Sequence, residues 1–494
     1  MKISISYPPL ESEKGTALLS QNRQFQWFNN PSFIYPMVPA YAATLLKEKG
    51  YHVVWDDAIA EKKSYSEWLD NLSCDLIAIE TKTPVVKMHW KIIDEIKEKT
   101  NCKVVLMGDH VTAMPLESME NSKVDFVLTG GDYDFLLLNI CEHLTKDKKL
   151  EPGIWYRDDG TRKIKNFSGV DKVQALPTIK NTGKFVLNHN LEELPLIDRE
   201  LTKWQLYKVN GNFKRLPGTY TMVGRDCWYH KCKFCSWPTL YPEFRVRKPE
   251  QLVEEIGSLI ENYGIREIMD DTGTFPVGEW LKRFCKEMIA KGYNKKVRID
   301  CNMRCGVLSA EEYSLMAEAG FRLLLFGLES ANQDTLDRID KGVKVEQIME
   351  SCRLAKKAGL YPHLTTMIGY PWESKEDASK TIKLAKEIFS KGYADTLQAT
   401  IVIPYPGTKL FDECKTNNCL LFEDWDRYDQ REAVMKSPLT DEEVKELTSE
   451  LYKVFWTPKY VSKKIISMRD MDDIKYAFRG VGKIFGHLTD FGGR

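Results

Sequence analysis

The sequence lacks the features that mark several specialised protein classes. No apolar run approaches the roughly 20 residues that a membrane-spanning helix requires. Positive charge is not in excess, because 71 Lys and Arg residues are balanced by 71 Asp and Glu residues, so we expect no nucleic-acid partner. No short repeat is visible, which argues against a solenoid. Residues 1–9 predict a strand and a turn, without the apolar core and cleavage site of a signal peptide.

The composition is that of an ordinary globular protein. Hydrophobic residues make up 43% of the chain and charged residues 29%, which excludes disorder throughout and a collagen-like repeat. A length of 494 residues predicts several domains of roughly 100–200 residues each. The 12 cysteines come without a secretory signal, so we expect a reducing, cytoplasmic setting in which cysteine packs, reacts or binds metal.

Residues 1–145 alternate strand and helix patterns. The expected strands are 2–7, 52–55, 75–80, 103–107 and 125–128, and the expected helices are 39–49, 85–99 and 132–144. Apolar strands separated by helices predict a doubly wound α/β domain whose parallel sheet is covered on both faces. Such sheets bind ligands outside the carboxyl ends of their strands.

A charged segment at 146–205 reads as a connector, with a small hairpin expected between 153–157 and 162–166. Residues 206–435 then alternate again. The expected strands are 219–223, 267–269, 297–302, 322–328, 363–368 and 396–401, and the expected helices are 249–263, 278–291, 310–319, 345–358 and 375–390. Six repeats predict a partial (β/α)6 barrel, whose chemistry would sit at the carboxyl ends of its strands. Residues 436–494 predict a helical C-terminal region.

The strongest motif is a group of three cysteines, Cys227, Cys232 and Cys235, directly after the first expected barrel strand. Three thiolates can hold a [4Fe–4S] cluster and leave one of its four irons open to a ligand. Zinc is the alternative, with His230 as a fourth ligand. Cys301 and Cys305 could bind a second metal, but buried packing is the favoured reading for free cysteines.

This cysteine motif resembles that of radical S-adenosylmethionine (SAM) enzymes, and the preceding domain resembles the cobalamin-binding domain of their largest subgroup. The resemblance covers residues 1–435 and extends to loops at 108–115, 124–131, 320–330, 368–373 and 403–408. One departure is that four residues, not the usual three, separate Cys227 from Cys232. We expect a local bulge to absorb the additional residue, because loops tolerate insertions.

The resemblance implies residues that bind SAM. The open iron would chelate its amino and carboxylate groups, and Phe234 would pack against the adenine or simply fill the core. Glu329, at the end of a strand, could accept a hydrogen bond from the ribose or the amino group, or be a satisfied structural carboxylate. Arg304 could bind the methionine carboxylate. Asp271 and its neighbour Asp270 could contact cofactor or substrate, or pair with Arg304.

The resemblance also implies a cobalamin at the carboxyl edge of the first sheet. Gly108 and Gly130 would allow the backbone to approach a flat macrocycle. Thr112, together with Thr81 and Thr83, could bond its amides or nucleotide tail. His110 is not expected to be the lower cobalt ligand, because the Asp-x-His-x-x-Gly pattern of methyl-carrying domains is absent; it should bond the tail or a neighbouring loop.

The expected function is methyl transfer to an unactivated carbon through a 5′-deoxyadenosyl radical. Alternatives are a non-methylating enzyme with the same cofactors, such as an oxidative cyclase, and a sensor without turnover. The expected partners are a small-molecule or lipid substrate and an electron donor such as ferredoxin or flavodoxin. The stretch from 451, with nine basic residues and four Asp, would either contact a membrane surface or pack on the barrel.

Overall fold

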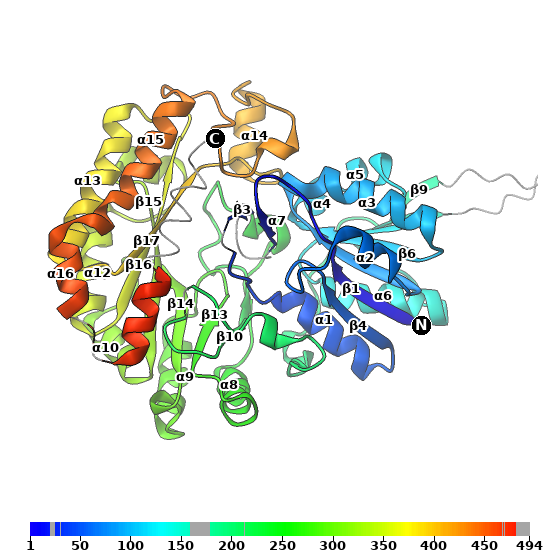
Figure 1. The fold of residues 1–494 in the computed structure, drawn as a ribbon, viewed down its shortest axis with the longest axis horizontal. Helices are drawn as coiled ribbons and strands as arrows, with labels where there is room; N and C mark the ends of the chain where they lie inside the picture. Colours follow the sequence, from blue (N-terminus) through cyan, green and yellow to red (C-terminus); the bar gives the residue numbers. More distant parts are fainter. Residues whose placement is uncertain are drawn as a thin grey trace, which may run out of the picture.

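The computed structural model describes residues 1–19, 25–29, 31–158, 178–211, 213–466, 468 and 470–480. They form two α/β units, one from the N-terminal part of the chain and one from its middle (Figure 1). Within these residues, no helix is both long and apolar enough to cross a membrane.

The first sheet has the strand order β4-β1-β5-β6-β7-β8-β9. Its parallel strands are β1 (Lys2–Tyr7), β4 (His52–Asp57), β5 (Leu76–Thr81), β6 (Lys103–Gly108) and β7 (Phe126–Leu128). The associated helices include α1 (Met37–Glu48), α3 (Val86–Lys99) and α6 (Tyr133–Lys146). Every residue of β5 is buried, as befits a strand covered on both faces. These elements confirm the strands and helices expected from the sequence, and the strand order reverses between β1 and β5, where sheets of this kind bind ligands.

Two antiparallel strands, β8 (Ile154–Asp158) and β9 (Thr178–Asn181), extend this sheet beyond β7. The first strand of the expected hairpin is present as β8, but it pairs with β9, and 162–166 lies outside the described residues. The distant partner is feasible because the entropy of loop closure rises only slowly with loop length. The first sheet therefore reaches into the segment that the sequence presents as a connector.

The second sheet has six parallel strands in chain order. They are β10 (Gly218–Thr221), β13 (Glu267–Asp270), β14 (Arg298–Met303), β15 (Phe321–Glu329), β16 (Tyr361–Ile368) and β17 (Thr396–Ile401). The helices between them include α8 (Pro249–Tyr263), α9 (Glu279–Ala290), α10 (Ala310–Glu318), α12 (Val345–Lys357) and α13 (Lys375–Lys391). This sheet is the expected half-barrel, and the loops after its strands share one mouth.

The C-terminal region packs against the barrel. Helix α15 (Asp441–Tyr452) begins with a capping box between Thr440 and Glu443. Further on, Asp472 binds Arg266 at 2.6 Å, and Arg479 Nη2 donates to the carbonyl oxygen of Phe213 at 2.9 Å. Asp472 and Arg479 therefore pack on the barrel, which was one of the two alternatives for this region. Ile465 and Ile466 of α16 (Pro458–Ile466) remain exposed.

A charged network joins the two units. Arg225, after β10, binds Asp134 of α6 at 2.5 Å, and Arg245 binds Asp132 at 2.6 Å. His189 Nδ1 lies 3.4 Å from Asp132 Oδ2, and its Nε2 lies 2.9 Å from Oε2 of Glu151. The arginines belong to the barrel unit, and the carboxylates belong to the N-terminal unit. The network therefore fixes one unit against the other.

Raising the pH should weaken this junction through His189. Burial lowers the pKa of His189, but Asp132 and Glu151 outweigh burial and raise it from 6.5 to about 9. The resulting stability is present below pH 6.5 and is lost as the pH rises through about 9. A shift of this size corresponds to ~3 kcal/mol, which solvent screening of the partly exposed imidazole reduces to ~2 kcal/mol. Thermal unfolding of wild-type protein should show a loss of this size across the window, and His189→Gln should lack it. The same pH dependence in both proteins would contradict this prediction.

Candidate active site

The three cysteines lie in the loop that leaves the first barrel strand. This loop connects two short paired strands, β11 (Gly224–Arg225) and β12 (Arg245–Val246). Asp226 and His230 adopt left-handed backbone conformations, with φ of 75° and 57°. Asp and His are among the residues that most often tolerate this region. The longer interval between the first two cysteines therefore contains one left-handed residue, His230.

The thiols of Cys227, Cys232 and Cys235 lie near enough to interact electrostatically. Burial raises the pKa of Cys232 and Cys235, whereas the cations Lys341 and Arg304 oppose the rise at Cys232. In the described part of the chain, no three His, Cys, Asp or Glu side chains gather where they could hold one metal ion. In a tetrahedral zinc site, all ligand atoms bind the same metal ion. In a [4Fe–4S] cluster, each thiolate binds a different iron. Three thiolates from one loop are a donor set that suits a [4Fe–4S] cluster.

His230, the alternative zinc ligand, is already engaged. Its Nδ1 contacts Oδ2 of Asp226, whose side chain is fully buried. Because three thiolates suffice to hold a [4Fe–4S] cluster, replacing His230 with Ala should leave about four irons per chain after anaerobic reconstitution. Metal analysis of the purified variant checks this, and a loss of half of the iron would identify His230 as a ligand.

Cys301 and Cys305 follow the packing reading. Both are buried in the barrel core, and burial raises the pKa of the Cys305 thiol to about 12. Burial also raises the pKa of Cys301 well above its ordinary value. Their side chains therefore fill the barrel core, as the packing alternative expects.

Glu329 forms a buried ion pair that the sequence did not reveal. It ends β15 in a left-handed conformation, with φ of 59°, where the register against β16 shifts between Gly327 and Glu329. Its Oε1 lies 2.7 Å from Nζ of Lys341. A Cβ at Gly327 would lie 2.2 Å from this Oε1 and 2.4 Å from this Nζ, so only glycine leaves room for the pair. Burial lowers the pKa of Lys341, but Glu329 and Cys232 outweigh it and keep the lysine charged.

Arg304 lies beside the cysteine loop and retains an unused donor. Its guanidinium is 3.5 Å from the ring centroid of Tyr229, and its Nη2 donates to the carbonyl oxygen of Lys341. Arg304 Nε and the hydroxyl of Tyr370 are buried and have no hydrogen-bond partner among the described residues. Leaving a buried polar atom without a hydrogen bond costs free energy, so an anionic or polar ligand at this position would supply the missing hydrogen bonds.

The other predicted SAM contacts have different surroundings. Asp270 accepts hydrogen bonds from Thr221 Oγ1 at 2.9 Å and from the Val223 amide at 3.1 Å, so it ties β13 to β10 instead of pairing with Arg304. Asp271 is buried directly after β13. Phe234 is half-buried, with its ring centroid 5.8 Å from the Lys341 ammonium. The structure thus brings Phe234 beside the buried ion pair.

At the carboxyl edge of the first sheet, the two predicted glycines serve close packing within the chain. A Cβ at Gly108 would lie 2.1 Å from the carbonyl oxygen of Thr81, and one at Gly130 would lie 2.6 Å from the ring of Phe185. Thr112 Oγ1 donates to the Gly108 carbonyl at 2.7 Å and accepts from the Gly130 amide at 3.2 Å. The three residues are therefore neighbours, and their contact with a macrocycle stays a prediction.

His110 is fully buried and bonded to neighbouring loops. Its Nδ1 lies 3.2 Å from Thr83 Oγ1, and its Nε2 lies 3.1 Å from Oε2 of Glu117. Trp425, which follows the barrel in sequence, donates to Oε1 of Glu117 at 2.9 Å and packs edge-on against His110. Both imidazole nitrogens have partners within the chain. That His110 does not bind cobalt stays a prediction.

The carboxyl-end loops of the two sheets meet. Arg225 Nη1, after β10, donates to the carbonyl oxygen of Gly131, after β7, at 3.1 Å. A Cβ at Gly131 would lie 2.0 Å from the ring of Tyr241, which lies in the same loop after the three cysteines. Helix α4 (Asp109–Ala113) contacts α7 (Trp237–Leu240). The two ligand-binding edges therefore face the same region.

Comparison with known proteins shows what this chain is similar to. Residues 222–385 match the radical SAM superfamily. The uncharacterized methyltransferase PH0819 of Pyrococcus horikoshii is 27% identical over 463 residues, which cover 91% of this chain and 94% of that protein. The anaerobic magnesium-protoporphyrin IX monomethyl ester cyclase of Cereibacter sphaeroides is 26% identical over 77% of this chain and 60% of its own length.

The fold is also that of a solved enzyme. The radical SAM methyltransferase TsrM from Kitasatospora setae, determined with cobalamin and a [4Fe–4S] cluster bound, aligns with 99% of both chains at a TM-score of 0.66 and 13% identity. At this identity the match establishes the shared architecture. Residues 222–385 are therefore a radical SAM domain, and the whole chain has the two-unit fold of a solved radical SAM methyltransferase that was determined with cobalamin bound.

Proposed function

We propose that this enzyme uses cobalamin and a [4Fe–4S] cluster to transfer a methyl group from SAM to an unactivated carbon. The observation that carries the proposal is the contact between the two carboxyl-end edges. Arg225, at the start of the cysteine loop, bonds to Gly131 on the first sheet, so a radical source and a methyl carrier would share one substrate region.

The barrel residues fit the cluster and SAM. Cys227, Cys232 and Cys235 would hold three irons, and the free Nε of Arg304 suits a carboxylate. Glu329, fixed by Lys341, would accept a hydrogen bond from the ribose or amino group. When bound, the cluster and SAM supply a 5′-deoxyadenosyl radical, and cobalamin supplies the methyl group.

The first sheet also has groups that suit a corrinoid. Glu80 Oε1 and the hydroxyl of Tyr133 are buried at its carboxyl edge without a hydrogen-bond partner among the described residues. The amide side chains of a corrin ring offer both donors and acceptors. Glu80 and Tyr133, with Thr112 between the two glycines, would orient the ring, while His110 stays bonded to Thr83 and Glu117.

Replacing His110 with Ala should leave the spectrum of bound Co(II) cobalamin largely unchanged. The reason is that both ring nitrogens of His110 are already occupied by protein partners. Affinity should fall by about tenfold or less, since a side-chain hydrogen bond contributes ~1 kcal/mol. Electron paramagnetic resonance checks this. Nitrogen hyperfine coupling present in the wild type and absent from the variant would make His110 the lower ligand.

The substrate would be a small molecule or a lipid, and a ferredoxin or flavodoxin would supply electrons in a reducing cytoplasm. Contact of the C-terminal region with a membrane surface stays a proposal, motivated by the exposed Ile465 and Ile466. An oxidative cyclisation is the second candidate, because the cyclase of Cereibacter sphaeroides is similar over 77% of the chain.

Product analysis of the reduced, anaerobically reconstituted full-length enzyme distinguishes these functions. Incubation with SAM carrying a labelled methyl group should yield both 5′-deoxyadenosine and S-adenosylhomocysteine, with the label on cobalamin. 5′-Deoxyadenosine without S-adenosylhomocysteine would favour the cyclase alternative. If neither product forms while cluster and cobalamin are fully loaded, both functions are wrong.

A further inference from the structure

Two thiols of the first sheet are in contact at its amino-terminal edge, opposite the candidate active site. Sγ of Cys74 lies 3.0 Å from Sγ of Cys102, and the residues are 28 positions apart. Cys74 lies just before β5 and Cys102 just before β6, and these strands pair with Leu76 opposite Lys103. Adjacent strands are about 4.8 Å apart, within the roughly 4.4–6.8 Å Cα separation of disulfides. A disulfide of ~2.05 Å needs only a small side-chain shift.

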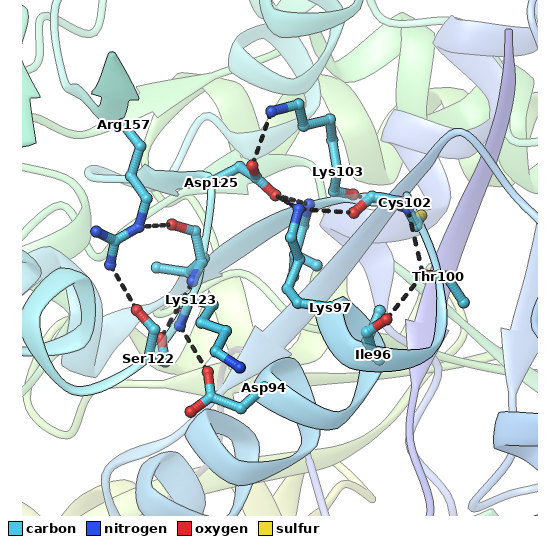
Figure 2. A network of polar contacts seen from close by, with 12 residues as sticks. Asp94, Ile96, Lys97, Thr100, Cys102, Lys103, Ser122, Lys123, Asp125 and Arg157 are labelled. Carbon is cyan, nitrogen blue, oxygen red and sulfur yellow. Dashed lines mark hydrogen bonds and ion pairs between the residues drawn. The ribbon is translucent and has the colours of Figure 1, made fainter. Parts of the chain in front are cut away.

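A polar network holds Cys102 in position (Figure 2). Thr100 Oγ1 accepts a hydrogen bond from the Cys102 amide at 3.2 Å. Lys97 Nζ donates to the Cys102 carbonyl at 3.1 Å and to Asp125 Oδ2 at 2.9 Å. These bonds tie the end of α3 to the start of β6, so the Cys102 thiol is kept beside its partner.

The two thiols have different accessibility. Cys102 is 2% exposed, whereas Cys74 is half-buried and can be reached from solvent. The hydrogen bond to Cys74, followed by burial, raises the pKa of Cys102, and the nearby ammonium of Lys97 opposes the rise. An external reagent would therefore meet Cys74 first, with Cys102 behind it as the second thiol.

We propose that Cys74 and Cys102 form a redox-active dithiol that exchanges with low-molecular-weight disulfides. The Cys74 thiolate attacks one sulfur of the external disulfide, forms a mixed disulfide and releases one thiolate. Deprotonated Cys102 then attacks Sγ of Cys74, forms the internal disulfide and releases the second thiolate. Two electrons pass from the protein to the external disulfide, and the two cysteine protons end on the two released thiols.

The link would join the segments that enter β5 and β6. The carboxyl ends of the same strands are Thr81 and Gly108, at the edge proposed to bind cobalamin. Oxidation would therefore rigidify this part of the sheet without placing a sulfur in the active site. The pair needs neither the cluster nor the cobalamin, so it is independent of the proposed function.

Peptide mapping of full-length protein in glutathione redox buffers tests the dithiol. As the ratio of oxidised to reduced glutathione rises, alkylation and mass spectrometry should show the peptide linked through Cys74 and Cys102 becoming the main species. Dithiothreitol should reverse it. Closing a loop of this size should raise the thermal midpoint by roughly 5 °C. The control variant Cys141→Ala lacks a buried thiol of α6 and should still form the link between Cys74 and Cys102.

Replacing Cys102 with Ser blocks only the second step. Cys74 should then accumulate a glutathione adduct that the wild-type protein lacks, a readout that does not depend on stability. Recovery of Cys74 and Cys102 as separately alkylated thiols at every ratio would overturn the proposal. Equal amounts of links between Cys74 and unrelated cysteines would also overturn it, since they would reflect scrambling.

Discussion

Replacing Cys227, Cys232 and Cys235 together with Ala is expected to reduce the iron content from about four atoms per chain to near zero. The three residues supply all the thiolates of the cysteine loop, and they are only partly buried, whereas the other thiols of the barrel, such as Cys301, are packed in its core. Visible charge-transfer absorption and formation of 5′-deoxyadenosine should disappear with the iron. Metal analysis, absorption spectroscopy and product analysis after anaerobic reconstitution measure these losses.

The matched control for this prediction is the double variant Cys301→Ala and Cys305→Ala. It removes two cysteines from the same barrel but should keep the full iron content, because both side chains pack in the core. Cobalamin binding should survive the triple replacement, since the proposed cobalamin site lies on the first sheet. A complete cluster in the triple variant would contradict the assignment, as would zinc as the sole metal of the anaerobically purified wild type.

Replacing Glu329 with Gln should have the second large effect. The variant leaves Lys341 buried and charged without its partner at 2.7 Å, which costs about 3–5 kcal/mol of stability. It also removes a carboxylate from the mouth of the barrel. A lost charged hydrogen bond of ~1.5–3 kcal/mol corresponds to SAM binding weakened by about 10- to 100-fold. Thermal unfolding and equilibrium binding of SAM to the cluster-loaded protein measure the two effects separately.

A second substitution distinguishes loss of fold from loss of ligand. Adding Lys341→Met to Glu329→Gln removes the unpaired charge, so the thermal midpoint should largely recover while SAM binding stays weak. Glu413→Gln, which breaks the partly exposed pair with Lys233 at 2.6 Å, should cost ~1 kcal/mol or less and leave binding unchanged. Wild-type SAM affinity in the stable double variant would exclude a binding role for Glu329.

The sequence was sufficient for the parallel strands of both sheets, whereas the pairing of β8 with β9 was not expected from it. Apolar runs such as those of β5 and β15 are buried along most or all of their length, and a parallel sheet between helices needs such runs. The position of the clustered cysteines could also be predicted, because the loop after the first barrel strand lies at the mouth of the barrel. These features depend on neighbours within a few residues or on periodicity, which a sequence displays directly.

Tertiary structure alone decided which groups share the site. Lys341 meets Glu329 because a register shift in β15 and the missing side chain of Gly327 open a space that no sequence pattern marks. His110 packs against Trp425, more than three hundred residues along the chain, and Cys74 meets Cys102 across adjacent strands. Such contacts depend on how distant segments pack. Composition and periodicity specify which face of an element is buried, whereas the partner on that face is chosen by the geometry of the assembled chain.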